Sequence, residues 1–237
     1  MNRGEIAEGL RGGMLMSLST SPFAILFGAL AVDNGISVAE AALMSTTIYA
    51  GASQLVGIEL FGSQVAAWLI VFSIFAVNFR HLLYSAAVSR LIPHFTPGQK
   101  ILAFFLLIDP QFAEVARRAD AGKTITFGWY LAFALAIYVP WIIFSVVGAA
   151  FGSLIGDPQV WAIDVLLPVY FLGITAGFRR KPGFYPVAAT AFIVSIAAYF
   201  LVGSPWHVSI GAAFGVLVGA LLPLPPPDAA KPAEAGH

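Results

Sequence analysis

The chain contains no cysteine and few charged residues. Without cysteine it can form no disulfide, no thiolate metal site and no cysteine nucleophile. Only 10% of its 237 residues are charged, whereas a soluble domain carries about a quarter. The twelve basic and twelve acidic residues cancel, so the net charge does not favour binding to nucleic acid. Because 59% of the residues are hydrophobic, we expect a lipid bilayer to surround most of the chain.

Sequence motifs of intramembrane and nucleotide-dependent enzymes are also absent. The chain has neither an H-E-x-x-H nor a G-x-S-x-G sequence. Gly122-Lys123-Thr124 resembles the end of a phosphate-binding loop, but Arg117 occupies the position that requires its first glycine. We therefore expect no enzymatic activity, no cofactor and no metal ion.

Long apolar runs dominate the sequence and predict transmembrane helices. A spanning helix needs about 20 mostly apolar residues, and no run shows the alternating pattern of membrane β-strands. The candidate spans are 12–32, 38–60, 64–88, 98–117, 126–151, 159–178, 184–203 and 206–223. We therefore predict an all-α, polytopic membrane helical bundle of about eight transmembrane segments, with several of the first four kinked or discontinuous. It forms a single domain, 1–225, before a short disordered tail, 226–237; seven spans are the alternative.

The ends of several predicted helices carry recognisable signals. Ser37 and Glu40 form a capping-box pattern, and Thr96 places a capping oxygen before a proline suited to a first helical turn. The small residues 29–31 resemble a signal-peptide cleavage site, but Pro22 and the mixed charge of the N-terminal region favour an uncleaved first span.

Lysine and arginine are distributed unevenly between the two sides of an eight-span protein. Arg90 and Lys100 fall on one side, Arg80 lies within a span, and the remaining nine fall on the opposite side. Those nine are Arg3, Arg11, Arg117, Arg118, Lys123, Arg179, Arg180, Lys181 and Lys231. Because basic residues concentrate in cytoplasmic loops, we expect both termini to be cytoplasmic.

Glycine recurs at every fourth residue in the last predicted span, at Gly211, Gly215 and Gly219. This spacing places the glycines on one helix face, where another helix can approach closely. It predicts helix packing, either within the chain or with a partner subunit.

Polar residues interrupt the first two predicted spans. In the first, Ser21 precedes Pro22, which removes a backbone donor, so we expect the helix to kink or open there. The candidates in the second are Gly51, Ser53, Gln54 and Glu59. Because polar groups are costly in hydrocarbon, this clustering favours a substrate site. The alternatives are a purely structural kink in the first span and interhelical hydrogen bonds in the second.

The third predicted span contains an arginine, Arg80, in the middle of an apolar run. Arg80 and Tyr84 are four residues apart and share one helix face, and Asn78 adds an amide nearby. An arginine at this depth must meet a carboxylate, backbone carbonyls or water, so Arg80 is a candidate to hold a substrate carboxylate in a forked pair. A structural ion pair and snorkelling of Arg80 to the interface are the alternatives.

Acidic residues in other predicted spans are candidates to carry protons. Asp109 precedes a proline, where the helix is expected to break, and Glu114 follows in the same span. A buried carboxyl group is readily neutralised, so we predict proton coupling through Asp109, Glu59, Asp164 or Glu114. A structural ion pair of Arg80 with Asp109, Asp164 or Glu59 is the alternative.

Three of these features together resemble the AzlC family. They are Pro22 in the first span, Gly-Ala-Ser-Gln at 51–54 in the second, and Asn-Phe-Arg-His with Tyr-Ser at 78–81 and 84–85 in the third. The likeness covers residues 5–223. It implies the large subunit of an exporter of branched-chain amino acids in the bacterial cytoplasmic (inner) membrane, with a small AzlD-type membrane subunit as its partner.

The chain departs from the pattern of this family at two acidic sites. It has Asp109-Pro110 where members often have Asp-Glu, and the run around Asp164 differs from the L-D-F-A-like family sequence. If the missing glutamate matters, Glu114 or Asp164 is expected to substitute. The predicted function is therefore a multi-pass exporter driven by the proton gradient; the alternatives are a channel or a non-catalytic membrane subunit for another small solute.

Overall fold

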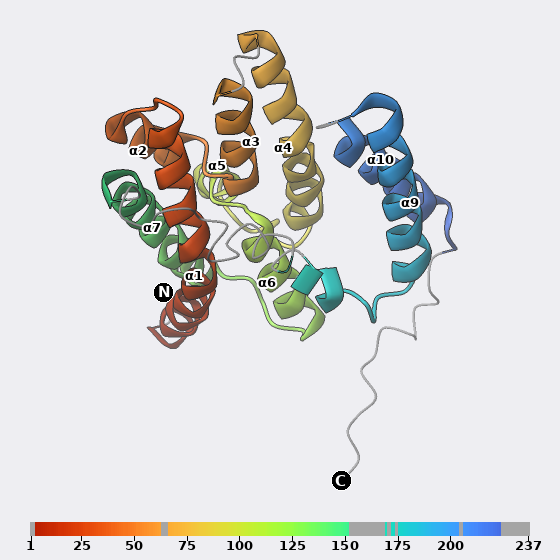
Figure 1. Ribbon diagram of the computed structural model, residues 1–237. Coiled ribbons are helices and arrows are strands. Elements are labelled where there is room, and N and C mark those ends of the chain that lie inside the picture. The colour runs from red at the N-terminus through yellow and green to blue at the C-terminus, as the bar shows by residue number, and fades with distance from the viewer. Residues whose placement is uncertain are drawn as a thin grey trace. The chain divides into compact units, whose positions relative to one another are not determined.

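The computed structural model describes residues 3–62, 66–151, 169, 172–173, 175–203 and 206–223 (Figure 1). Within these ranges all regular secondary structure is helical, which confirms the predicted all-α class. The chain divides into two compact units, Met1–Ile174 and Thr175–His237. The predicted tail, 226–237, lies outside the described residues.

Four of the described helices are long and apolar enough to cross a membrane. They are α1 (Arg3–Asp33), α4 (Ala67–Ser89), α7 (Phe127–Phe151) and α9 (Phe184–Val202). The last described helix, α10 (Trp206–Leu221), is apolar but shorter. The chain is therefore a membrane protein with several apolar helices.

Two of the predicted spans are each divided into a pair of short helices. The stretch 38–60 contains α2 (Val38–Thr47) and α3 (Gly51–Gly62), and the stretch 98–117 contains α5 (Pro97–Phe105) and α6 (Asp109–Asp120). The longest of these helices has 12 residues, which corresponds to about 18 Å at 1.5 Å per residue. The hydrocarbon core of a bilayer is about 30 Å thick, so none of the four can cross it alone.

The same local signals delimit both pairs of short helices. Ser37 and Glu40 cap α2 reciprocally, as predicted, and Thr96 and Gln99 form an equivalent capping box on α5. Each pair is separated by three residues, 48–50 and 106–108. Pro110 occupies the first turn of α6, where its missing N–H costs no helical hydrogen bond.

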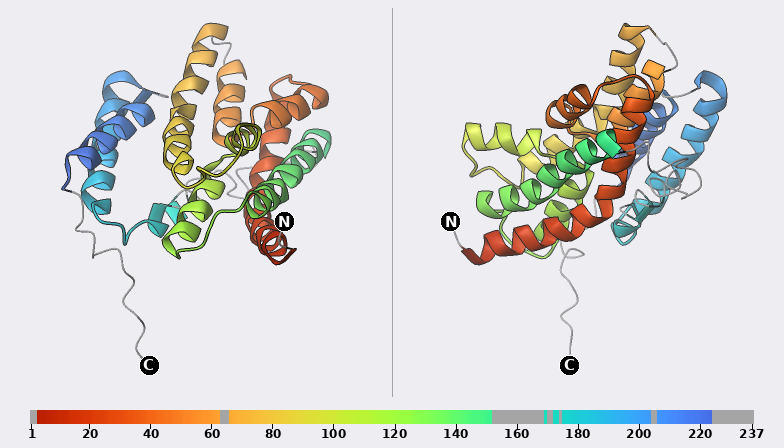
Figure 2. Two further views of the ribbon diagram at one scale, coloured as in Figure 1. Left: turned by 180° about the vertical axis from the view of Figure 1, so that it is seen from behind. Right: turned by 60° about the vertical axis from the view of Figure 1, so that its left-hand side comes forward.

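The first helix continues through Pro22 over its full 31 residues. The hydroxyls of Thr20 and Ser21 donate to the carbonyl oxygen of Ser17, at 3.2 and 2.7 Å. Hydroxyl groups that bond back to the preceding turn often bend a helix, and α1 changes direction along its length in the right-hand view of Figure 2.

Helices α1 and α7 run parallel and in close contact. Gly9 lies against Trp129 and Phe133 near the start of both helices, and Gly28 lies against Ser145 near the end of both. A Cβ atom at Gly28 would overlap the carbonyl oxygen of Ser145. Only glycine allows backbones to approach this closely. We name the two ends of this unit after the direction of these helices. The "start face" is the end at which α1 and α7 begin, near Gly9 and Trp129. The "finish face" is the opposite end, near Gly28 and Ser145.

Three clusters of buried apolar residues follow one another along α1 and α7. The cluster at the start face comprises Val88, Ile92, Phe95, Ala103, Leu107, Val115, Ile125, Trp129, Tyr130, Phe133 and Ile137. The middle cluster comprises Phe23, Ala24, Tyr49, Leu106, Ala134 and Trp141. The cluster at the finish face comprises Phe27, Ala31, Ala41, Ile58 and Ala149. The breaks of both short-helix pairs therefore contribute to the middle cluster.

The second unit contains an antiparallel pair of helices, α9 and α10. Gly203 has a φ of 80° in the connection, a conformation that favours glycine. Gly211 and Gly215 of α10 pack against Ala191 of α9. The predicted glycine face thus packs within the chain.

We expect Gly28→Ala to lower the free energy of unfolding by about 1–3 kcal/mol or more, because the added methyl group must push two helix backbones apart. Gly98→Ala is the matched control, since a Cβ at Gly98 meets no atom within 4 Å. Thermal unfolding of both purified variants in the same detergent measures the effect. Equal midpoints for the two variants would contradict the close α1–α7 contact.

Candidate functional site

An ion pair joins α4 to the start of α6. Arg80 Nη1 lies 3.2 Å from Asp109 Oδ1, and the Tyr84 hydroxyl donates to the same oxygen at 2.8 Å. The side chains of Arg80 and Asp109 are 24% and 13% exposed, so the ion pair is largely buried within the protein. The Tyr84 ring stacks on Phe112, with centroids 4.3 Å apart. The structure thus contains the pairing of Arg80 with Asp109 that the sequence left as an alternative.

Gln54 belongs to a closed ring of hydrogen bonds among α2, α3 and α7. Its Nε2 donates to Ser45 Oγ at 3.1 Å, and its Oε1 accepts from Trp141 Nε1 at 3.2 Å. The Ser45 hydroxyl donates to Ser145, whose hydroxyl donates to the carbonyl oxygen of Trp141. Gln54, Ser45 and Ser145 are fully buried. Because both ends of the amide are already paired, this arrangement favours a structural role for Gln54.

The neighbouring candidates on α3 contact other helices. The Ser53 hydroxyl donates to Asn78 Oδ1 of α4 at 2.5 Å. Gly51, at the start of α3, lies against the indole ring of Trp141, which a Cβ at this position would overlap. Ser53 therefore links α3 to the helix that carries Arg80, and Gly51 provides room for Trp141.

A cavity of about 380 Å³ lies where the breaks of the two short-helix pairs meet. It is lined by Thr47, Ile48, Tyr49, Ala50, Asn78, His81, Phe104, Phe105 and Leu107. The volume is at the small end of the range for small-molecule sites, roughly 300–1,000 Å³. Its wall combines apolar side chains with the amide of Asn78 and the imidazole of His81, which suits a small solute with a polar and an apolar part.

Tyr138, near the middle of α7, contacts the breaks of both pairs. Its ring packs edge-on against Tyr49, with centroids 4.7 Å apart, and against Phe105, at 6.0 Å. Its hydroxyl donates to the carbonyl oxygen of Thr46 at the end of α2. The cavity thus lies at mid-depth along α7.

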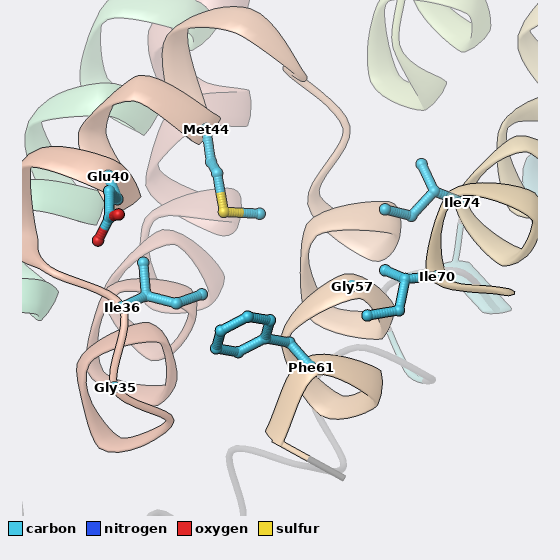
Figure 3. Close-up of a pocket in the computed structure, with 8 residues that line it drawn as sticks. All are labelled: Gly35, Ile36, Glu40, Met44, Gly57, Phe61, Ile70 and Ile74. Atoms are coloured by element: carbon cyan, nitrogen blue, oxygen red, sulfur yellow. The ribbon is translucent and has the colours of Figure 1, made fainter. Parts of the chain in front are cut away.

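A second cavity, of about 310 Å³, lies among α2, α3 and α4 nearer the finish face. Figure 3 shows Met44 and Phe61 on one side and Ile70 and Ile74 on the other. The carboxylate of Glu40 also lines it but is engaged by the backbone N–H and hydroxyl of Ser37. This space is mainly apolar and offers little to bind a charged group.

Four predicted candidates lie away from this arrangement or outside the described residues. Ser21 is bonded within α1, and Glu114 forms an ion pair with Arg117 on α6. Glu59 has an exposed side chain on α3 and forms no ion pair with the residues that the structure describes. Asp164 lies outside the described residues.

Sequence reasoning missed several residues of the site. Ser45, Ser145 and Trp141 complete the ring around Gln54, and Tyr138 connects the two breaks. None of these residues belongs to a recognisable sequence motif, and their partners lie up to 100 positions away in the chain. The one available signal was the presence of a serine in each of two predicted spans, because serines hydrogen-bond between membrane helices.

These features describe a membrane protein in which apolar helices surround an open cavity at mid-depth along α7. The chain belongs to the AzlC family: the family model described as AzlC protein matches residues 16–155, more than half of the chain. This confirms the resemblance inferred from residues 22, 51–54 and 78–85. All the candidate residues except Asp164 fall within the matched region.

Two named relatives are also membrane proteins. The chain is 29% identical to the inner membrane protein YgaZ of Escherichia coli K12 over 220 residues, which cover 90% of this chain and 89% of that protein. It is 34% identical to an uncharacterized membrane protein of Archaeoglobus fulgidus over 150 residues, which cover 63% and 62% of the two chains. No solved structure matches the chain.

We expect Gln54→Leu to destabilise the protein by about 1–3 kcal/mol, because it leaves the buried indole N–H of Trp141 without an acceptor. Thr46→Val is a control on the adjoining helix, since it removes a hydroxyl from a less buried position and should change stability by less than about 0.5 kcal/mol. Thermal unfolding followed by tryptophan fluorescence compares the two. A full-stability Gln54→Leu variant that has lost solute binding would instead assign Gln54 to the substrate site.

The Arg80–Asp109 pair predicts energetic coupling between two substitutions. Arg80→Met or Asp109→Asn alone leaves a poorly compensated polar partner, whereas the double variant removes the ion pair entirely. We expect a coupling energy of about 0.5–3 kcal/mol from a double-mutant cycle of unfolding free energies in detergent. Strict additivity would show that the two groups do not interact in the folded protein.

Proposed function

We propose that this protein is a secondary transporter that exports branched-chain and other small apolar amino acids from the cytoplasm. It works in the cytoplasmic membrane with a small AzlD-type partner subunit and has both termini on the cytoplasmic side. Membership of the AzlC family and the resemblance of its motifs to the exporters of that family support the proposal. The observation that carries it is the mid-depth cavity between two interrupted helix pairs, a device that transporters use to bind polar groups of a solute within the bilayer.

The cavity is suited to a small zwitterion with an apolar side chain. α3 and α6 both begin directly after a break, and the first N–H groups of a helix, with its dipole, attract an anion such as a carboxylate. Asn78 and His81 offer further polar contacts in the wall. Ile48, Phe104 and Leu107 offer an apolar surface to the side chain. Because one methylene in such a pocket is worth only about 1–3 kcal/mol, we expect broad specificity among leucine, isoleucine and valine.

The Arg80–Asp109 pair supplies a mechanism for coupling to protons. Asp109 lies against Arg80 in the structure. We expect Arg80 to hold the carboxylate of the solute, in the forked pair that a guanidinium forms, and Asp109 to hold either the ammonium group of the solute or a proton. Solute and proton thus compete for Asp109, as the exchange of one for the other across the membrane requires. Glu114 is less suited to this role because Arg117 already holds it.

Efflux from cells that express this chain with its partner subunit tests the proposal. Cells preloaded with leucine or valine should lose both faster than cells without the pair, and an uncoupler should stop this loss. Asp109→Asn and Arg80→Ala should reduce efflux about tenfold or more, equivalent to ~1.4 kcal/mol, at equal protein levels in the membrane. Glu114→Gln is the control that removes an acidic group of α6 away from the cavity and should retain efflux.

Three outcomes would contradict this function. Loss of neither amino acid would reject the substrate class. Flux that does not saturate and ignores the uncoupler would indicate a channel. Normal efflux in both the Asp109→Asn and Arg80→Ala variants would remove these residues from the mechanism.

A further inference from the structure

We infer that α2–α3 and α5–α6 are re-entrant hairpins, which enter the membrane from opposite faces and line one cavity with their tips. Neither hairpin crosses the membrane. The inference rests on the proposed function only for the identity of the solute in the cavity.

Both outer ends of the α2–α3 hairpin lie at the finish face. α2 begins directly after α1 ends, and Gly62 at the end of α3 lies against the side chain of Asn34 in the connection between α1 and α2. Ala41 of α2 and Ile58 of α3 share a cluster with Ala149 at the end of α7. α3 therefore returns to the face from which α2 departs.

Both outer ends of the α5–α6 hairpin lie at the start face. In the segment before α5, His94 Nε2 lies 2.9 Å from the carbonyl oxygen of Ile125. At the end of α6, Arg118 Nε donates to the carbonyl oxygen of Thr124, and its guanidinium lies 4.5 Å from the centre of the Trp129 ring. Both ends thus contact the beginning of α7, so α6 also returns to the face from which α5 departs.

The two hairpin tips meet midway between the faces. Tyr49 and Leu106 share the middle cluster with Phe23 and Trp141, and both tips line the 380 Å³ cavity. Non-helical backbone at membrane depth is tolerated only where it is buried in protein or lines a cavity. The tips satisfy this condition, whereas a lipid-exposed break would not.

The distribution of basic residues supports hairpins over crossings. In an eight-span protein, Arg90 and Lys100 lie on the side opposite to the other basic residues outside the spans. If 38–62 and 97–120 each turn back, Arg90 and Lys100 move to the start face. That face then holds every basic residue of 3–151 except Arg80: Arg3, Arg11, Arg90, Lys100, Arg117, Arg118 and Lys123. Such a one-sided distribution is the one expected for a membrane protein.

The two hairpins also belong to structurally equivalent halves that run in opposite directions. α1–α2–α3 and α4–α5–α6 each consist of a long helix, a capping box, and two short helices separated by three residues. Each hairpin has one fully buried glutamine early in its second helix, Gln54 or Gln111, that bonds to α7. Repeats of inverted topology are the architecture from which many secondary transporters build alternating access.

This geometry makes each hairpin a gate to one face. α2–α3 lies between the cavity and the finish face, and α5–α6 lies between the cavity and the start face. The polar contacts of α5–α6 with the long helices include two ion pairs, Asp109 with Arg80 and Arg118 with Glu8, the second at 2.9 Å. Movement of one hairpin away from its long helices would open the cavity toward one face while the other hairpin stays in place.

Single-cysteine labelling tests the hairpins, and the chain is suited to it because it has no native cysteine. Ala66→Cys and Gly98→Cys are the informative variants, since both positions are exposed and the two topologies place them on different sides. Ala39→Cys and Ala121→Cys are exposed controls whose sides do not depend on the topology. The probe is a membrane-impermeant maleimide, added to intact and to permeabilised cells that express the chain with its partner.

We expect Ala66→Cys to be labelled together with Ala39→Cys in intact cells, and Gly98→Cys together with Ala121→Cys only after permeabilisation. The opposite pairing, Ala66→Cys with Ala121→Cys and Gly98→Cys with Ala39→Cys, would establish eight crossings and overturn the inference. A result in which only one of the two variants follows the expected pattern also overturns it, because the hairpins would not be opposed.

Substrate protection tests whether both tips line one cavity. In permeabilised cells, saturating leucine should slow alkylation of Thr47→Cys and Phe105→Cys several-fold and leave Ala121→Cys unchanged. Protection of only one tip would overturn the shared cavity. A third outcome is the expected labelling pattern with no protection of either tip by leucine. The cavity would then not be a leucine site, and the proposed substrate would be wrong. The opposed orientation of the hairpins would still stand, because it depends on the labelling alone.

Discussion

The need to satisfy polar groups away from water governs how this chain folds. Hydrocarbon offers no hydrogen-bond partner, so every interruption of a helix must be covered by other parts of the protein. The close parallel contact of α1 and α7, made possible by glycines such as Gly28, provides that cover. Residues in the middle of both helices pack on Tyr49 and Leu106 at the two breaks. The cavity can therefore exist at mid-depth without exposing bare backbone to lipid.

The two polar clusters around the cavity differ in how easily they can rearrange. The ring that includes Gln54 is closed, and each of its donors has an acceptor within the ring. Breaking one bond leaves a buried group unpaired, so this cluster stabilises one arrangement of α2, α3 and α7. At Asp109, by contrast, a single carboxylate oxygen receives both Arg80 and Tyr84. In the function that we propose, a proton or a solute would replace one of these partners.

Family membership and the lining of the cavity both support the proposed function. The AzlC match runs from the middle of α1 to the end of α7 and includes both pairs of short helices. Between these pairs, apolar residues such as Phe104 and Leu107 face polar ones such as Asn78. A site of this mixed character fits an amphiphilic solute better than an inorganic ion, which would require a shell of oxygen ligands.

The sequence by itself determined that lipid surrounds most of the chain, that the fold is helical, and where several helices begin or break. Composition excludes a water-facing surface, Ser37 and Glu40 define a cap, and a proline after Asp109 disfavours an uninterrupted helix. It also identified Arg80 as a group that needs a partner and named Asp109 among the candidates. Only the tertiary structure decided that α3 and α6 turn back toward the faces from which α2 and α5 depart. Hydropathy sums residues along a local window, whereas the direction of a short helix depends on contacts with distant residues, as between Gly62 and Asn34.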